Sequence, residues 1–328
     1  MSVRATLARH KQTILLVLII VLAARVFIPQ LDTLAESIKE LASANLVWVA
    51  LAAVLFLCGM PVLAFQFTAL SFKKLDFSIT LRVQAATMFI SKLLPQGVGL
   101  ISTNIYYYIK KGHTPSEATA ALTMNAITSF IAYIFLIIAA LFYSDISLRG
   151  IFEEGTVRSN ISILGLLFLI AAAITIFNAT GIKNKIKASW ANFKLNLVRY
   201  KERPKAVFSS TVWNGIGTSL NILALICSAK ALGVDISFAD AFLAYTFGNI
   251  AATLVPTPGG LGSAEMGIYS GLVLAGIDQS SAMSITLLYR FVSYWLPTIP
   301  GYYFFNSLKK SVFSDYSFKK RTNPKVAT

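Results

Sequence analysis

Apolar residues in this chain gather in long, nearly uninterrupted runs, instead of alternating or following one face of a helix. A helix of about 20 apolar residues is long enough to cross the hydrocarbon core of a bilayer, and helices that are apolar all round are typical of membrane spans. The runs therefore predict six spanning helices, at about residues 12–29, 45–71, 116–143, 160–180, 206–232 and 280–306.

Two more apolar regions, at about 79–111 and 238–276, are interrupted by proline and glycine. The first interruption is Leu94-Pro95-Gln96-Gly97-Val98-Gly99, and the second runs from Pro256 to Gly262. Proline ends or kinks a helix, and each remaining half is too short to cross a bilayer alone. We therefore expect two re-entrant helical hairpins. The alternative is that these residues only kink two ordinary spans.

The two broken regions also resemble each other. Each break is followed by a short apolar stretch, a glycine-led turn at Gly112 or Gly276, and a long span. Threaded through a bilayer, the hairpins enter from opposite sides, as in the inverted repeats of many secondary transporters. We expect repeats at about 45–180 and 206–306 in a single transmembrane domain, residues 1–328. The expected fold class is an all-α polytopic membrane protein with six spanning helices plus two re-entrant hairpins.

Composition and charge agree with a membrane protein. Hydrophobic residues make up 56% of the chain and charged residues 13%, and the mean hydropathy is +0.67, whereas soluble domains are about one quarter charged. The net charge is +15, and 22 of the 29 Lys and Arg residues fall on one side of the threading. The positive-inside rule makes that side cytoplasmic, with both termini and the basic tail 308–328 inside. Segment 183–203 mixes basic and aromatic residues, so its expected partner is the anionic cytoplasmic leaflet and not nucleic acid.

Metal and cofactor chemistry is not expected. Cys58 and Cys227 both lie in apolar runs, the only histidines are His10 and His113, and the carboxylates are not clustered. The sequence therefore predicts no disulfide, no metal site and no cofactor.

The ends of the half-helices offer binding chemistry instead. A half-helix that starts just after Gly99 or Gly260 directs unpaired backbone N–H groups and a partial positive charge toward an anion such as phosphate. Glycine also lets that anion approach the backbone closely. The residues of the two breaks are therefore candidate substrate-binding residues: Pro95, Gly97, Gly99, Pro258, Gly259, Gly260 and Gly262.

Three charged residues join these candidates. Glu265 follows the second break and is expected to be a counter-ion for a cationic headgroup, or a helix cap. Arg290 lies well inside the last span, where a charge costs roughly 2.5–3.5 kcal/mol on insertion scales, so it needs a partner in Glu265 or a lipid phosphate. A Glu265–Arg290 pair that only locks the second repeat is the structural alternative. Lys92 precedes the first break and either serves the inner entrance or extends to the membrane interface.

Other polar and aromatic residues are expected to have structural roles. Asn125, Asn214 and Asn221 lie inside apolar runs, where amide side chains join neighbouring helices by hydrogen bonds. The run Tyr106-Tyr107-Tyr108 is typical of the aromatic belt at a membrane interface.

The paired breaks, the string Pro258-Gly259-Gly260-Leu261-Gly262-Ser263-Ala264-Glu265 and the following Tyr289-Arg290 resemble the membrane domain of the lysylphosphatidylglycerol synthase/flippase family, also called flippase-like or UPF0104 proteins. The resemblance covers nearly the whole chain. It implies the translocating half of such proteins, without the aminoacyltransferase domain, so synthase activity is not expected. Other members are linked to glycolipid or polyprenyl-linked sugar pathways.

The first repeat departs from the family pattern. Relatives often carry an acid and an arginine after the first Gly-Gly, where this chain has Ile101 and Asn104, with Leu100 in place of the second glycine. An acid-arginine pair expected in the next helix is Asn125-Ala126. Asn104 is thus a candidate binding residue in a neutral half-site, and the second half-site keeps the charged pair.

The sequence therefore predicts a translocase of phospholipid, aminoacylated phospholipid or lipid-linked sugar in a bacterial cytoplasmic membrane, with the acyl chains left in the bilayer. The expected protein partners are an envelope-biosynthesis enzyme or a second copy of the chain. Three rival functions remain: a small-ion or solute transporter, an intramembrane transferase that uses Glu265 as its acid or base, and a scaffold for an envelope-assembly enzyme.

Overall fold

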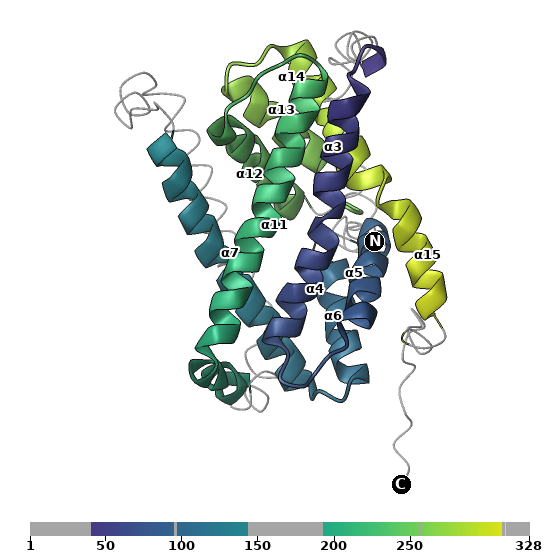
Figure 1. Cartoon of the computed structure of the whole chain (residues 1–328), viewed down its shortest axis with the longest axis vertical. Helices are drawn as coiled ribbons and strands as arrows, with labels where there is room; N and C mark the ends of the chain where they lie inside the picture. Colours follow the sequence, from purple (N-terminus) through teal and green to yellow (C-terminus); the bar gives the residue numbers. More distant parts are fainter. Residues whose placement is uncertain (1–40, 95–96, 144–192, 256, 310–311, 313–328) are drawn as a thin grey trace, which may run out of the picture.

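The computed structural model describes residues 41–94, 97–143, 193–255, 257–309 and 312, and this part of the chain is helical, without β-strands (Figure 1). The α-helices are α3 (Leu46–Leu57), α4 (Gly59–Leu70), α5 (Phe77–Leu93), α6 (Val98–Lys110), α7 (Pro115–Tyr143), α11 (Pro204–Ala231), α12 (Phe238–Leu254), α13 (Ser263–Leu274), α14 (Gln279–Arg290) and α15 (Thr298–Leu308). A 3₁₀ turn (Arg199–Glu202) precedes α11, and a π-helical turn (Phe291–Trp295) separates α14 from α15.

Three helical stretches within the described residues are long and apolar enough to cross a membrane. They are Leu46–Leu70, Pro115–Ala140 and Pro204–Ala231, of 25, 26 and 28 residues. They agree in place with the spans expected at 45–71, 116–143 and 206–232, as helices of sufficient length and apolar character. The first consists of α3 and α4, which meet at Cys58. The spans expected at 12–29 and 160–180 lie outside the described residues.

The span expected at 280–306 is helical but not regular. It comprises α14, the π-helical turn and α15, and Leu296 N donates to Phe291 O at 3.0 Å within the turn. Pro297 follows at once. Because a proline ring clashes with the carbonyl four residues earlier, the regular α-helical pattern cannot continue through this position. Turns of this π type often occur at functional sites.

The first broken region forms an antiparallel helical hairpin of α5 and α6. A Cβ on Gly99 would lie 2.5 Å from Ser91 Cα, so only glycine permits this crossing. Farther from the break, Gln84 Nε2 donates to Asn104 Oδ1 at 2.8 Å. The two ends of the region meet again, since Ser71 Oγ lies 2.9 Å from His113 Nε2. The hairpin therefore returns to the end of the molecule from which it entered.

The second broken region forms a matching hairpin of α12 and α13. A Cβ on Gly271 would lie 2.5 Å from Ala244 Cα, and one on Gly267 would lie 2.4 Å from Phe247 O. The two helices are therefore antiparallel and are joined by a turn around Pro258. Figure 1 shows α12 and α13 in the upper half of the molecule and α5 and α6 in the lower half.

Helix α11 runs along the centre and packs against α3, α4, α7 and α12. Asn214 on α11 donates to Asn125 Oδ1 and to Thr128 Oγ1 on α7, at 3.3 and 3.1 Å. Ser129 Oγ donates to Asn214 Oδ1 at 2.5 Å. Asn125 and Asn214 thus join two helices, as the sequence predicts.

The tyrosine run does not form an exposed belt. Tyr107 and Tyr108 are completely buried, with their hydroxyl groups 2.9 Å from Thr80 Oγ1 and 2.6 Å from Phe67 O. The expectation of an interfacial belt was wrong for these two residues, because the hairpin carries α6 back along α5 and α4, where their hydroxyl groups find partners inside the protein.

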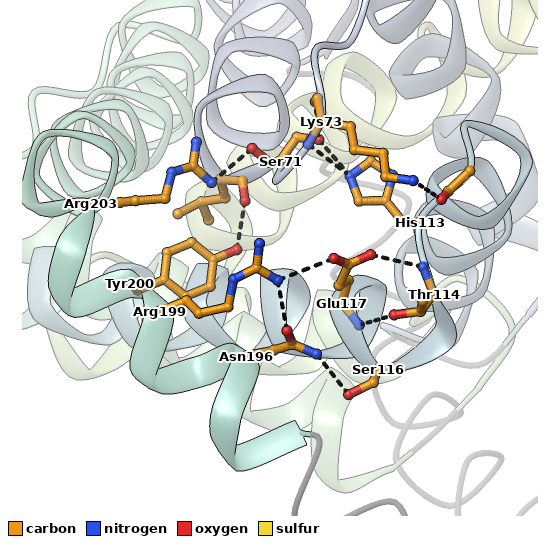
Figure 2. Close-up of polar contacts among 12 residues, drawn as sticks. Ser71, Lys73, His113, Thr114, Ser116, Glu117, Asn196, Arg199, Tyr200 and Arg203 are labelled. Atoms are coloured by element: carbon orange, nitrogen blue, oxygen red, sulfur yellow. Dashed lines mark hydrogen bonds and ion pairs between the residues drawn. The ribbon is translucent and has the colours of Figure 1, made fainter.

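A polar cluster joins three connections at the lower end of the molecule (Figure 2). His113 follows α6, and its Nε2 accepts a hydrogen bond from Lys73 N in the α4–α5 connection at 3.2 Å. Arg199 Nη1 lies 3.1 Å from Glu117 Oε1, and Arg203 Nη1 donates to Ser71 O at 2.9 Å. The cluster brings three of the basic segments of the chain to one end.

Candidate functional site

The two breaks meet in the middle of the molecule. Gly259 N, in the second break, donates to Leu94 O, at the start of the first break, at 3.0 Å. A Cβ on Gly259 would lie 2.7 Å from Tyr294 Cε2 and 3.1 Å from Lys92 Cα, so the backbone there is tightly enclosed. One site therefore contains groups from both hairpins and from the last helical region, where the sequence suggested two separate half-sites.

Both half-helices start at a glycine with left-handed backbone, although not at the glycines expected. Helix α6 begins after Gly97 (φ 80°) and α13 begins after Gly262 (φ 82°). An L-residue rarely adopts that φ, so glycine is needed at each start. Gly99 lies inside α6 and packs on α5, while Gly260 is buried in the turn before α13.

Glu265 is held by two hydrogen bonds that occupy both of its carboxylate oxygens. Its Oε2 accepts from Gly262 N at 2.7 Å, which caps the start of α13. Its Oε1 accepts from Arg290 Nε at 2.7 Å, and the two side chains are only 16% and 12% exposed. Both sequence-based expectations for Glu265, a cap and a partner of Arg290, describe its position.

The guanidinium of Arg290 has a hydrogen-bond donor that Glu265 does not use. Its Nη2 is buried and has no hydrogen-bond partner in the described part of the chain. A buried guanidinium without full hydrogen bonding is costly, and a guanidinium can hold a phosphate or carboxylate by two parallel hydrogen bonds. The free side of Arg290 is therefore suited to an anion.

Tyr294 brings a second basic group to the site. Lys92 Nζ lies 4.1 Å from the centroid of its ring, and Arg290 Cζ lies 4.7 Å from the same centroid. Both distances are within the range of cation–π attraction. Lys92 comes from the first hairpin, so it lies in the shared site and does not extend to an interface. Within the described residues it forms no ion pair.

A cavity of about 170 Å³ lies against these residues. Its polar lining includes Lys92, Asn221, Tyr245, Asn249, Arg290 and Ser293, and Gly259 and Gly248 form part of its backbone wall. The amide groups of Asn221 and Asn249 each donate to a carbonyl one turn earlier in their own helix, Gly217 O and Tyr245 O. A second hollow, of about 410 Å³, shares Tyr245 and Asn249 with the first.

Several predicted residues lie away from this cavity. Asn104 is fully buried between α5 and α6, bonded to Gln84 and to Leu100 O, and does not line the cavity. Gly97 and Pro258 are exposed in the two turns, and Pro95 is outside the described residues.

Three polar residues that line the cavity, and Tyr294 beside Lys92 and Arg290, were not predicted from the sequence. Tyr245, Asn249, Ser293 and Tyr294 were not singled out, and Asn221 was assigned to helix–helix contacts. The spacing of four residues between Arg290 and Tyr294, and between Tyr245 and Asn249, places each pair on one helical face and was the one available signal.

The comparisons with known proteins agree with this architecture. The family described as "Lysylphosphatidylglycerol synthase TM region" matches residues 13–301. The chain is 25% identical over 244 residues to a UPF0104 membrane protein of Methanocaldococcus jannaschii, a match that covers 70% of this chain and 97% of the relative.

Two other archaeal relatives match shorter stretches. A UPF0104 membrane protein of Pyrococcus horikoshii is 31% identical over 121 residues, which cover 37% of this chain and 36% of the relative. One of Methanothermobacter thermautotrophicus is 29% identical over 96 residues, 29% of each chain. Since the family match covers most of the sequence, this multi-pass membrane protein belongs to the family of the lysylphosphatidylglycerol synthase transmembrane region.

Proposed function

We propose that this protein is a lipid translocase, which passes the headgroup of a phospholipid or lipid-linked sugar through the cavity between its two broken hairpins. The observation that carries the proposal is the meeting of Lys92 from one hairpin with Arg290 and Tyr294 from the last helical region, beside Gly259 of the other hairpin. Buried charges in membrane proteins typically mark a substrate pathway.

The size of the cavity supports a headgroup as its occupant. A volume of about 170 Å³ corresponds to a handful of water molecules, whereas sites that enclose a whole drug-sized ligand have about 300–1,000 Å³. A headgroup can therefore enter while the hydrocarbon chains remain outside. The many exposed apolar side chains, such as Phe130 at 68% and Phe208 at 72%, suit a protein surrounded by lipid.

The arrangement of the hairpins supports alternating access from the two membrane faces. The connections at the lower end carry Lys73, Lys111, Arg199 and Arg203, so this end is the cytoplasmic one in our proposal. The first hairpin then enters from the cytoplasm and the second from outside, as expected for re-entrant inverted repeats. Six spanning helices and cytoplasmic termini complete this topology, in the cytoplasmic membrane of the cell. The archaeal relatives give no preference for a bacterial source.

The rival functions have less support in the site. A transferase would need Glu265 as a free acid or base, but both of its oxygens accept strong hydrogen bonds. A transporter of small cations has less support, because Lys92 and Arg290 would repel a cation in the cavity. A scaffold would give no reason for a buried Arg290 Nη2 without a partner.

The proposal is tested by reconstituting the purified protein into liposomes with fluorescent phospholipids and a quencher restricted to the outer leaflet. We expect the wild type to move lipid between leaflets, and Arg290→Ala and Gly260→Leu to lose most of this activity. Gly260 has a left-handed φ of 71°, so leucine there is strained. Gly59→Leu is the matched control, since nothing lies within 4 Å of its added Cβ. If the folded wild type moves no lipid across a broad panel, the translocase proposal is wrong.

A further inference from the structure

We propose that the central cavity selects the phosphate of an anionic lipid headgroup and rejects a headgroup with a net positive charge, such as lysyl-phosphatidylglycerol. This inference rests on the proposed function and names its substrate class. It concerns the balance of charge among Lys92 and Arg290, which line the cavity, and Glu265, which pairs with Arg290.

Both carboxylate oxygens of Glu265 already have hydrogen-bond partners within the protein. Glu265 accepts from Gly262 N and from Arg290 Nε, each at 2.7 Å. An ammonium group that approached this carboxylate would have to replace either the cap of α13 or the pair with Arg290. Replacing Arg290 would leave a buried guanidinium without its counter-ion, which is strongly unfavourable. Glu265 is therefore not available as a partner for a cationic headgroup.

The basic groups, in contrast, lack a full set of partners. Arg290 Nη2 has no hydrogen-bond partner, and Lys92 Nζ rests on the Tyr294 ring without a carboxylate within ion-pair distance in the described residues. Lys92 Nζ and Arg290 Cζ lie 4.1 and 4.7 Å from the centroid of the same ring, so the two basic groups belong to one small site. A phosphate has several oxygens and can accept from a guanidinium and an ammonium at the same time.

Charge repulsion decides between headgroups. With Lys92 and Arg290 charged and Glu265 ionised, the cluster carries one excess positive charge. Charges interact strongly where water is excluded, so an additional ammonium would be repelled by both basic groups, whereas a phosphate neutralises the excess and stabilises their charged forms. Lysyl-phosphatidylglycerol has two ammonium groups for one phosphate, so its headgroup adds to the excess.

The uncharged lining suits the hydroxyl groups of such a headgroup. The side chains of Asn221 and Asn249 line the cavity, and an amide group can accept a hydrogen bond from a hydroxyl through its oxygen. A glycerol or sugar hydroxyl can donate to them and leave no polar group of the headgroup unsatisfied. The predicted ligand is therefore a lipid phosphate that carries a polyol.

The test measures binding of four lipids with identical dioleoyl chains to the full chain in detergent. Phosphatidylglycerol and phosphatidic acid are anionic, phosphatidylcholine is zwitterionic and lysyl-phosphatidylglycerol is cationic. We expect the two anionic lipids to bind at least about tenfold more tightly than phosphatidylcholine, with lysyl-phosphatidylglycerol weakest. Inorganic phosphate at millimolar concentration is the competitor. If phosphate alone displaces the lipid at an equal dissociation constant, the ligand is free phosphate and the lipid assignment fails.

Two variants keep the test decisive. Lys92→Met keeps an unbranched side chain, one atom shorter, and removes the charge, and it should reduce the preference for phosphatidylglycerol over phosphatidylcholine about tenfold. Arg290→Gln should do the same, but it breaks the pair with Glu265 and could unfold the protein, so the result for Lys92→Met decides. Lys110→Met is a control outside the cavity lining and should leave the preference unchanged. Equal or tighter binding of lysyl-phosphatidylglycerol by the wild type, or an unchanged preference in Lys92→Met, would overturn the inference.

The two proposals fail in different ways. Lipid transport with a reversed charge preference contradicts only the selectivity for an anionic headgroup. Charge-selective binding without any transport in liposomes contradicts only the translocase function.

Discussion

The close contact of α12 and α13 makes a quantitative prediction about Gly267. A Cβ at this position would lie 2.4 Å from Phe247 O and 2.7 Å from Gly248 Cα, both of them backbone atoms that cannot rotate away. Ordinary contacts begin near 3.4 Å, so Gly267→Ala must separate the two helices by about 1 Å. A gap of that size forfeits roughly a quarter to a half of the dispersion energy of each contact that it opens.

The expected loss of stability follows from two opposing effects. Overpacking of a well-packed interior costs about 1–3 kcal/mol, and replacing glycine by alanine inside a helix returns at most about 1 kcal/mol. We therefore expect Gly267→Ala to destabilise the protein by about 1–2 kcal/mol. Gly215→Ala is the matched control, because this glycine is also inside a helix but its added Cβ would come no nearer than 3.9 Å to Ala132 Cβ. That variant should be neutral or slightly more stable.

A thermal melt in detergent measures both changes through the thiol of Cys227, which is buried and becomes reactive on unfolding. The exposed Cys58 is first replaced by serine so that it gives no background signal. We expect Gly267→Ala to melt a few degrees below its parent and Gly215→Ala at or above it. A melting temperature for Gly267→Ala that is unchanged or raised would refute the close packing of this hairpin.

Three further predictions concern single side chains. Tyr294→Leu should weaken binding of phosphatidylglycerol about 2- to 30-fold, because it removes a ring whose attraction to its two cations is worth roughly 0.5–2 kcal/mol. Tyr294→Phe keeps the ring and should retain binding. Equal losses in both variants would argue against a role for the ring. Asn104→Leu should destabilise the protein by about 1–3 kcal/mol, because Gln84 loses its buried hydrogen-bond partner. The affinity for lipid should not change. A loss of affinity in a variant of unchanged stability would place Asn104 at the site. Burial lowers the pKa of His113 from 6.5, so the unfolded chain binds this proton more readily. The contribution of His113 to stability is full above about pH 6.5 and declines as the pH falls through that value, which melts at pH 5 to 8 would detect; His113→Gln should flatten this part of the profile.

The spans and hairpins could be predicted from the sequence because they follow from local rules. Runs of apolar residues gave the three long helical stretches, and the proline and glycine breaks gave two pairs of half-helices of 17 and 13 and of 17 and 12 residues. Glu265 was one of two partners predicted for Arg290, with a lipid phosphate as the other, because a charge in an apolar span needs a partner.

The composition of the site depended on tertiary packing that no local rule contains. Lys92 is one turn from the first break, and nothing in its own segment indicates that it meets Tyr294, about 200 residues later. Asn104 and Asn221 are the same residue type in apolar surroundings, yet one pairs with Gln84 and the other lines the cavity. Which amide finds a partner is decided by the helix that packs opposite.

The irregular last span shows the same limit. Its apolar run predicts one continuous helix, but Pro297 and the π-helical turn interrupt it at Phe291–Trp295. This turn lies between α14, which packs on α13, and α15, which packs on α5. It therefore positions Arg290 and Tyr294 between the two hairpins.

The most direct test of the proposed pathway uses Ser293, which lines the cavity and has a buried hydroxyl without a hydrogen-bond partner in the described chain. Ser293→Cys would be made in a background with Cys58→Ser and Cys227→Ser, reconstituted with fluorescent phosphatidylglycerol, and treated with a small thiol-specific reagent. We predict that modification stops lipid movement, that a reductant restores it, and that excess phosphatidylglycerol slows the modification. Complete modification with an undiminished rate of lipid movement would show that the headgroup does not pass through this cavity.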